Sequence, residues 1–146
     1  RIADDFVDDT RALFSYLAHT GFGKRKSVGY GSIALRGFEP YEALPASENA
    51  NAFVSLSSFV PATNDPVNGF WRTRVKYGKL GEELAVSGNP FKRPFVQLVA
   101  GSVFFDSPVR EWYGRMVQGL SPSHSEAVQY GLALALPVHI SGGVSA

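Results

Sequence analysis

The stretch RPFVQLVAGSVFF, Arg93 to Phe105, is apolar enough to be a central strand of a sheet, and so is AVQYGLALALPVHI, Ala127 to Ile140. Both are rich in the β-branched, aromatic and aliphatic residues that suit a pleated and buried surface. These two stretches predict a fold dominated by an antiparallel sheet.

Two further segments extend this pattern. AFVSLSSFV, Ala52 to Val60, predicts another strand, and FWRTRVKYG, Phe70 to Gly78, alternates from Trp71 onward. In that alternation Trp71, Thr73, Val75 and Tyr77 face one way, and Arg72, Arg74 and Lys76 face the other. We expect Trp71 and Tyr77 on the packed side of this strand and the three cations on its other face.

The N-terminal region predicts a helix. Apolar and small residues recur at helical spacing, namely Phe6, Thr10, Leu13, Phe14 and Leu17. Residues 5–20 are therefore expected to form a helix with one buried stripe, ended by Gly21. SVGYGSIALRGF, residues 27–38, predicts a strand, and the turn-rich residues 40–51 predict a linker. The fold class is α+β.

Composition excludes several classes of protein. The chain has 146 residues, 45% of them hydrophobic and 18% charged, which is enough for one globular domain or two small ones. It has no cysteine, so disulfides, zinc fingers and Fe–S sites are excluded, as suits a reducing cytoplasm. No apolar run approaches the roughly 20 residues that span a membrane. The chain begins RIADDFVDD, without initiator methionine or signal region, and we expect it to be the later part of a longer polypeptide.

The net charge of +1 hides a local concentration of cations in GFGKRKSVGYG, Gly21 to Gly31. Glycine tolerates positive φ, so a glycine-rich loop can turn several N–H groups toward one concave, anion-attracting spot. Lys24, Arg25 and Lys26 can contact phosphates, Ser27 can donate a hydrogen bond, and Tyr30 offers a ring face to a base. The alternative is a tight turn with solvated cations. The spacing fits neither a Walker A loop nor a dinucleotide fingerprint, so no cofactor is expected.

The helix followed by GFGKRKSVGYGSIAL resembles the glycine-rich loop of the RAMP superfamily of CRISPR-associated proteins. That pattern is a glycine pair, basic residues, Ser, and then G-x-G entering a strand. FVSLSSFVP, KRPFVQLVAGSVFF and AVQYGLALALPV follow in the order and spacing of the C-terminal half of the Csm-type subunit that caps the guide RNA (crRNA) 5′ end in type III-A effector complexes. The resemblance covers about residues 10 to 140.

The resemblance implies a ferredoxin-like, RRM-related fold. Residues 1–39 would be the end of a first RAMP unit, with helix, glycine-rich loop and strand, and residues 50–146 a C-terminal RAMP domain. The implied role is a cytoplasmic scaffold that binds the guide-RNA 5′ tag and contacts the large polymerase-like subunit and the backbone RAMP subunits. RNA-binding residues would be Gly21, Gly23, Lys24, Arg25, Lys26, Ser27, Gly29, Tyr30, Gly31, Arg72, Arg74 and Lys76.

Two other functions stay open. Relatives that process precursor crRNA often use a histidine, and His19 lies two residues before the loop. It is the one weak catalytic candidate, because metal-independent RNA cleavage usually needs two positioned groups. His124 and His139 are expected to be structural, and no histidine has a metal-ligand partner at the required spacing. The third possibility is a β-rich protein-interaction domain, in which Arg72, Arg74 and Lys76 protect a solvated edge strand.

Overall fold

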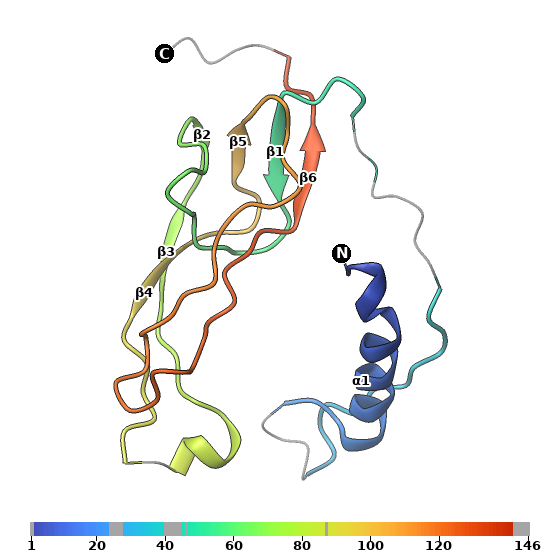
Figure 1. Ribbon diagram of the computed structural model, residues 1–146, viewed down its shortest axis with the longest axis vertical. Helices are drawn as coiled ribbons and strands as arrows, with labels where there is room; N and C mark the ends of the chain where they lie inside the picture. Colours follow the sequence, from blue (N-terminus) through green and yellow to red (C-terminus); the bar gives the residue numbers. More distant parts are fainter. Residues whose placement is uncertain (1, 24–27, 40–44, 46, 87, 142–146) are drawn as a thin grey trace. The chain divides into compact units, whose positions relative to one another are not determined.

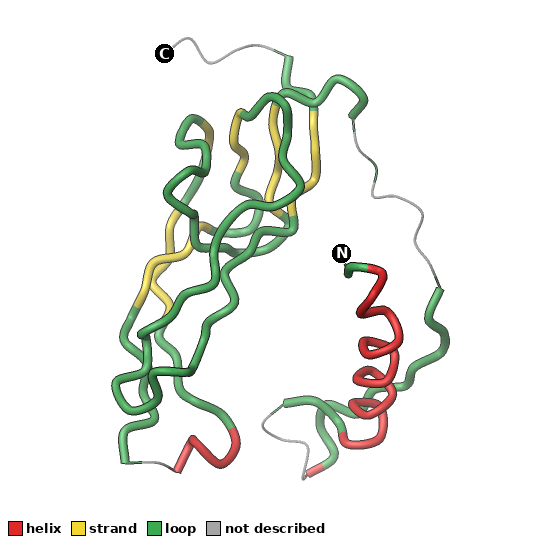
Figure 2. Tube along the Cα trace, in the orientation of Figure 1, coloured by secondary structure: helices red, strands yellow, loops and turns green. Residues whose placement is uncertain are grey.

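The computed structural model describes residues 2–23, 28–39, 45, 47–86 and 88–141. The chain forms two compact units, Arg1–Glu42 and Ala43–Ala146. The α+β class is confirmed, with one N-terminal α-helix and antiparallel strands in a four-stranded and a two-stranded sheet (Figures 1 and 2). No helix in the described part of the chain is both long and apolar enough to cross a membrane.

The first unit is built around its helix. A short 3-10 turn, η1 (Asp4–Phe6), leads into α1 (Val7–Thr20), which ends at Gly21 as predicted. The Gly21 N–H donates to the carbonyl of Leu17 at 2.8 Å, and its φ of 74° turns the chain away from the helix axis. The predicted end of the helix is thus confirmed, while the α-helix begins at Val7, two residues after the predicted start at residue 5.

The buried stripe expected on α1 is wrong, because no residue of the helix is buried. Leu13 is 63% exposed and Phe14 43%. The partial cover comes from Phe38, whose ring lies 6.0 Å from that of Phe14 and under the guanidinium of Arg11. The strand expected over 27–38 is also wrong for its described part: residues 28–39 hold no strand, since this unit offers no described strand with which to pair.

The second unit contains a four-stranded antiparallel sheet. Its strands are β1 (Ala52–Ser55), β2 (Gly69–Phe70), β5 (Val103–Phe105) and β6 (Ala135–Val138), in the order β2-β5-β1-β6. Phe53 of β1 lies opposite Phe104 on one side and Pro137 on the other. Because β1 has a neighbour on each edge, its Ala52 and Phe53 are fully buried.

A second sheet pairs β3 (Thr73–Lys76) with β4 (Phe95–Leu98), and a 3-10 turn, η3 (Glu82–Val86), lies between them in sequence. In Figure 1 these two strands form a ribbon that runs away from the larger sheet. At one end of the ribbon Leu98 and Phe59 exchange two backbone hydrogen bonds of 2.8 and 3.1 Å, and just before β4 the Arg93 N–H donates to the Leu120 carbonyl at 2.7 Å.

The two apolar runs do not each form one strand. RPFVQLVAGSVFF supplies both β4 and β5, in different sheets, because Gly101 turns the chain with a φ of 88° and donates its N–H to the Ser55 carbonyl at 2.7 Å. AVQYGLALALPVHI is a strand only in β6, although Gln129 and Leu132 form isolated antiparallel bridges with Val117 and Gly114. Sheet pairing therefore changes partner along both runs.

The ferredoxin-like topology expected from the resemblance is not displayed. That topology packs helices against one face of an antiparallel sheet, whereas the single α-helix among the described residues is α1, in the first unit. The fold that is shown is α+β with two antiparallel sheets.

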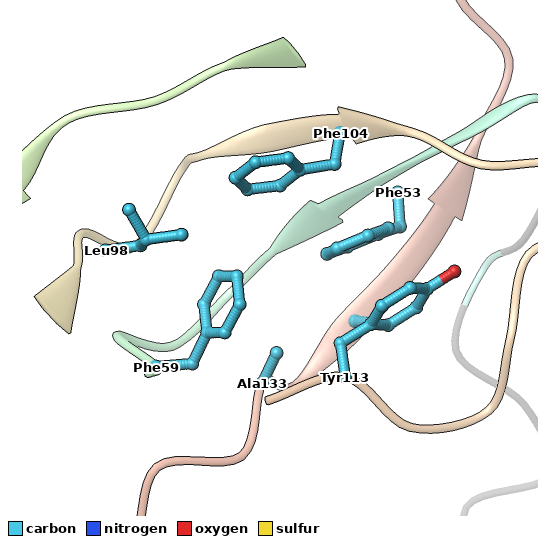
Figure 3. Packing of buried hydrophobic residues seen from close by; sticks show 7 residues of the cluster. Phe53, Phe59, Leu98, Phe104, Tyr113 and Ala133 are labelled. Carbon is cyan, nitrogen blue, oxygen red and sulfur yellow. The ribbon is translucent and has the colours of Figure 1, made fainter. Parts of the chain in front are cut away.

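The hydrophobic core of the second unit is a stack of aromatic rings (Figure 3). Phe53 lies between Phe104, at 5.5 Å between centroids, and Tyr113, at 3.7 Å. The edge of Phe59 meets Phe104 at 6.0 Å and 81°. Tyr113 is 1% exposed, so the ring from the irregular segment after β5 closes the core as completely as a strand residue would.

A buried polar network holds this segment in place. The side chain of Asp65 is 4% exposed and accepts the backbone N–H groups of Ala62, at 2.8 Å, and Gly114, at 2.7 Å. Arg110 bridges Asp65, at 3.3 Å, and Asp106, at 3.0 Å. The Tyr113 hydroxyl donates to Asp106 at 2.7 Å and accepts the Arg110 N–H at 2.8 Å.

Asp65→Ala is expected to destabilise the second unit by about 3 kcal/mol, because it leaves two backbone N–H groups without their acceptor and removes one of the two carboxylate partners of Arg110. Chemical denaturation followed by circular dichroism measures the change. Glu126→Ala is the matched control, since that carboxylate is exposed and its contacts are local, with His124 at 3.1 Å and with its own backbone N–H. Equal stability of Asp65→Ala and the unaltered chain would show that the network does not hold the fold.

Stability is expected to fall at alkaline pH through Tyr113. Burial, and then its hydrogen bond to the Asp106 carboxylate, raise the pKa of Tyr113 to about 12 from 10.0. The unfolded chain therefore releases this proton first, and the stabilisation, complete below pH 10, is lost progressively toward pH 12. Denaturation midpoints measured between pH 9 and about 12 should decline less in Tyr113→Phe than in the control Tyr130→Phe, whose ring is exposed. Parallel declines would contradict the assignment.

Candidate nucleic-acid interface

The glycine-rich loop follows α1 directly. All four of its glycines have positive φ, with values of 74° at Gly21, 99° at Gly23, 86° at Gly29 and 74° at Gly31. The Phe22 N–H donates to the Gly31 carbonyl at 2.8 Å and closes the base of the loop. The predicted phosphate-contacting residues Lys24, Arg25, Lys26 and Ser27 lie outside the described residues. The described residues of the loop therefore have the positive φ angles that the prediction requires, and its cations lie outside the described residues.

Two of these glycines have different surroundings. A Cβ on Gly31 would lie 1.8 Å from the Phe22 carbonyl oxygen, so no side chain fits there, whereas a Cβ on Gly29 would meet nothing within 4 Å. Gly31 is thus needed for the close approach that closes the loop. Tyr30, between them, has a side chain that is 65% exposed.

The histidines are held by local contacts. His19 lies at the end of α1, where its Nδ1 is 2.8 Å from the Ser15 carbonyl in the preceding turn. His139 makes the same kind of contact with the Asn49 carbonyl at 2.8 Å, and His124 pairs with Glu126. The pKa of Glu126 is lowered, first by its own backbone N–H and then by the His124 hydrogen bond. Across the described residues, no group of three acidic or histidine side chains could hold a metal ion.

The three cations of the second unit lie on and beside β3. Arg72 precedes the strand, and the side chains of Arg72 and Arg74 are exposed while that of Lys76 is partly buried. Arg74 lies opposite Gln97 and donates to its side-chain oxygen at 3.4 Å. Consecutive cations are two residues apart, about 7 Å along a strand. The alternation predicted for Arg74 and Lys76 is therefore present in the ribbon.

The predicted packed side of this strand is covered at one end and open farther along. Leu98, which pairs with Thr73 on that face, is buried, but the next pair, Val75 and Val96, is 52% and 53% exposed. On the other face Lys76 pairs with Phe95, which packs against a buried cluster around Val117. Each face of the ribbon is therefore covered in part, and the apolar one is open to solvent at Val75 and Val96.

Trp71 and Tyr77 were expected in the core and are exposed, at 51% and 77%. Both lie outside the strand, since β2 ends at Phe70 and β3 begins at Thr73. Alternation inside a strand therefore does not fix the side on which they lie. Trp71 is left as a large aromatic side chain on the surface, directly before Arg72.

Trp71 borders two cavities. One, of about 430 Å³, is mostly apolar and is lined by Trp71 together with Val60, Val67, Val96, Leu98 and Phe104. The other, of about 700 Å³, is lined by Trp71 and Arg72 with Asn68, Gly69, Gly101 and Ser102. We call Trp71, Arg72, Arg74, Lys76 and the two cavities the Trp71 surface. Trp71 and Arg72 line these cavities, whereas Arg74 and Lys76 lie on the other face of the ribbon from Thr73 and Val96, which line the apolar one.

The lining of the apolar cavity carries one cation and one carboxylate. Arg115 lines it and donates to the Pro61 carbonyl at 3.3 Å. Asp65 is the one acidic residue in the described lining, and its carboxylate is already engaged by Arg110 and two backbone N–H groups. A negatively charged ligand would therefore meet Arg115 and a carboxylate that is already paired.

The sequence predicted that Arg72, Arg74 and Lys76 are exposed cations. It did not predict the exposed indole of Trp71 or the two cavities beside it. The residues that form the cavity walls come from segments as far apart as Val60 and Phe104, and only the tertiary structure brings them together.

No protein-family model matches this chain, and no curated protein is similar to it. The glycine-rich loop belongs to the first unit and the Trp71 surface to the second.

Gly31→Ala is expected to open the base of the glycine-rich loop, while Gly29→Ala leaves it closed. The reason is that only at Gly31 would the added carbon collide with backbone, although both positions carry the strain of positive φ. Hydrogen exchange at the Phe22 amide, measured by NMR, reports on closure. Faster exchange in Gly31→Ala alone supports this role, and equal exchange in the two variants would refute it.

Proposed function

We propose that this chain binds single-stranded RNA and serves as the guide-RNA-binding scaffold subunit of a type III CRISPR effector complex. One observation carries the RNA-binding part: a half-exposed Trp71 is followed by the exposed Arg72 and Arg74, and no carboxylate is available among the described residues that line the adjacent cavities. Single-strand binding proteins combine such stacking faces with cations that follow the backbone.

The spacing of the cations suits an extended polyanion. Arg74 and Lys76 are about 7 Å apart along β3, and Arg72 lies directly before the strand, so the three can neutralise different phosphates of an extended RNA strand. An arginine also offers a planar donor pair to phosphate oxygens, which a lysine does not. Single-stranded rather than duplex RNA is favoured, because an exposed ring can stack only on a base that is not already stacked in a helix.

The wider role rests on the resemblance to RAMP proteins. In that role the glycine-rich loop, with Lys24, Arg25 and Lys26, holds the 5′ tag in the cytoplasm. The ferredoxin-like fold is part of this proposal, as are contacts with the large polymerase-like subunit and the backbone RAMP subunits. The exposed Val75 and Val96 support a protein contact, since adjacent apolar side chains on an open ribbon gain free energy when a partner covers them.

A binding role is favoured over catalysis. General acid–base cleavage of RNA needs a second positioned group beside His19, and its one described contact is the Ser15 carbonyl of its own helix. That contact orients the imidazole ring along α1. The proposal therefore gives His19 no chemical step.

A protein-interaction domain is the second candidate. Two features of the ribbon support it, the apolar Val75–Val96 pair and the position of β3 at the edge of a two-stranded sheet. An edge strand can accept another strand, and cations on it discourage unwanted pairing. This reading explains the cations of β3 without RNA, so it makes a different prediction for their removal.

Replacing Arg72, Arg74 and Lys76 together with glutamate is expected to abolish binding of single-stranded RNA. It should also reduce the slope of log affinity against log salt by about 0.7 for each lost phosphate contact. Filter binding over a salt titration measures both quantities.

The triple variant Lys79→Glu, Lys92→Glu, Arg93→Glu is the matched control, because it makes the same change in net charge farther along the chain. A much smaller loss in the control supports binding at the Trp71 surface. Full affinity and an unchanged slope in the Arg72, Arg74 and Lys76 variant would move these cations to a protein contact.

A further inference from the structure

Trp71 separates two cavities of different chemistry. The indole and Val67 line both of them. One cavity has mostly apolar walls, with Val96, Leu98 and Phe104. The other is mixed, with Phe70 and Val99 beside Asn68 and Arg72, and is called the polar cavity for these last two. A ligand that occupies both cavities would match them best with an apolar, flat part next to a charged or polar part.

The apolar cavity is large enough for an aromatic ring system. A dry apolar cavity of about 150 Å³ already accepts benzene, and this one measures about 430 Å³. A heterocyclic base would fit with its face toward the indole, and Thr73, Arg115 and the backbone at Gln97 line the cavity with groups that can hydrogen-bond to its edge. Base stacking on an aromatic side chain tolerates any base, because each has a π face.

The polar cavity suits the remainder of a nucleotide. Arg72 lines it with an exposed guanidinium, and Asn68 adds an amide. Both are common contacts to phosphate and sugar oxygens. The excess of cations over available carboxylates makes an anionic ligand a better match than the side chain of a neutral protein partner.

We infer that Trp71 captures one base of the bound single strand in the apolar cavity, while Arg72 holds the adjoining phosphate at the polar one. This inference rests on the proposed RNA binding and adds a defined nucleotide subsite to it. Trp71 is then the residue that distinguishes RNA with bases from a plain polyanion. Arg72, Arg74 and Lys76 supply charge neutralisation and make no such distinction.

The chain contains two tryptophans, so Trp112→Phe leaves Trp71 as the sole indole reporter. In that variant, short single-stranded RNA of mixed sequence is expected to quench the tryptophan fluorescence. An abasic ribose-phosphate oligomer of the same length should bind with little quenching, since it offers no ring to stack on Trp71. Equal quenching by both oligomers would overturn base capture.

Affinity gives an independent test. Trp71→Ala is expected to weaken binding of the base-containing RNA at least fivefold, within the range for loss of one base–aromatic stack, and to leave binding of the abasic oligomer unchanged. Trp71→Phe should restore part of the loss. Trp112→Ala is the matched control, because that indole is 49% exposed, close to the 51% of Trp71, and lines neither cavity.

The outcomes separate this inference from the proposed function. RNA binding that needs Arg72, Arg74 and Lys76 but is equal in Trp71→Ala and the unaltered chain overturns base capture alone. An unaltered chain that binds no RNA overturns both. If Trp71→Ala melts far below the control, quenching in Trp112→Phe decides the question in a chain that keeps its Trp71.

Discussion

The buried carboxylate of Asp65 is the constraint on which the second unit depends. A charge with 4% of its side chain exposed is tolerated only when its lone pairs are occupied, and here Ala62, Gly114 and Arg110 occupy them. These groups come from segments before β2 and after β5, so the carboxylate fixes two irregular segments against each other where no sheet pairing does so. The chain then enters β2 and Trp71 from a defined position.

The aromatic core and the polar network meet at Tyr113. Its ring stacks on Phe53 of the central strand, and its hydroxyl joins Asp106 and Arg110. The short strands would give few ladder hydrogen bonds by themselves, and this residue connects them to the long connections that make up much of the unit (Figure 2). The ribbon of β3 and β4 reaches this aromatic core through Leu98, and Phe95 at the other end of β4 packs against Val60, Val117 and Leu120. These contacts stabilise a two-stranded ribbon that would be marginal by itself.

The sequence predicted the features that are decided within a few residues, and it missed those that depend on which segments pair or pack together in the fold. Helical spacing and Gly21 located α1, because capping and amphipathic spacing act within a few residues. The apolar run from Arg93 to Phe105 was located as strand, yet Gly101 divides it between two sheets. Alternation put Arg74 and Lys76 on one face correctly, while the exposure of Val75 on the other face was not foreseen, since it depends on whether another layer covers that part of the ribbon. No local pattern contains that information.

The cations on and beside β3 can be explained by protection of an edge strand or by binding of a nucleic acid. The exposed indole of Trp71 distinguishes between these two explanations. Charges on an edge strand prevent association with other strands, which accounts for Arg72, Arg74 and Lys76 without any ligand. Edge protection gives no reason for a tryptophan to be half exposed, because an exposed large aromatic favours the association that the charges oppose. Stacking on a nucleobase uses both features at once, the ring for the base and the cations for its phosphates. The position of Trp71 between an apolar and a polar cavity is therefore better explained by a ligand with both kinds of group than by protection of the edge.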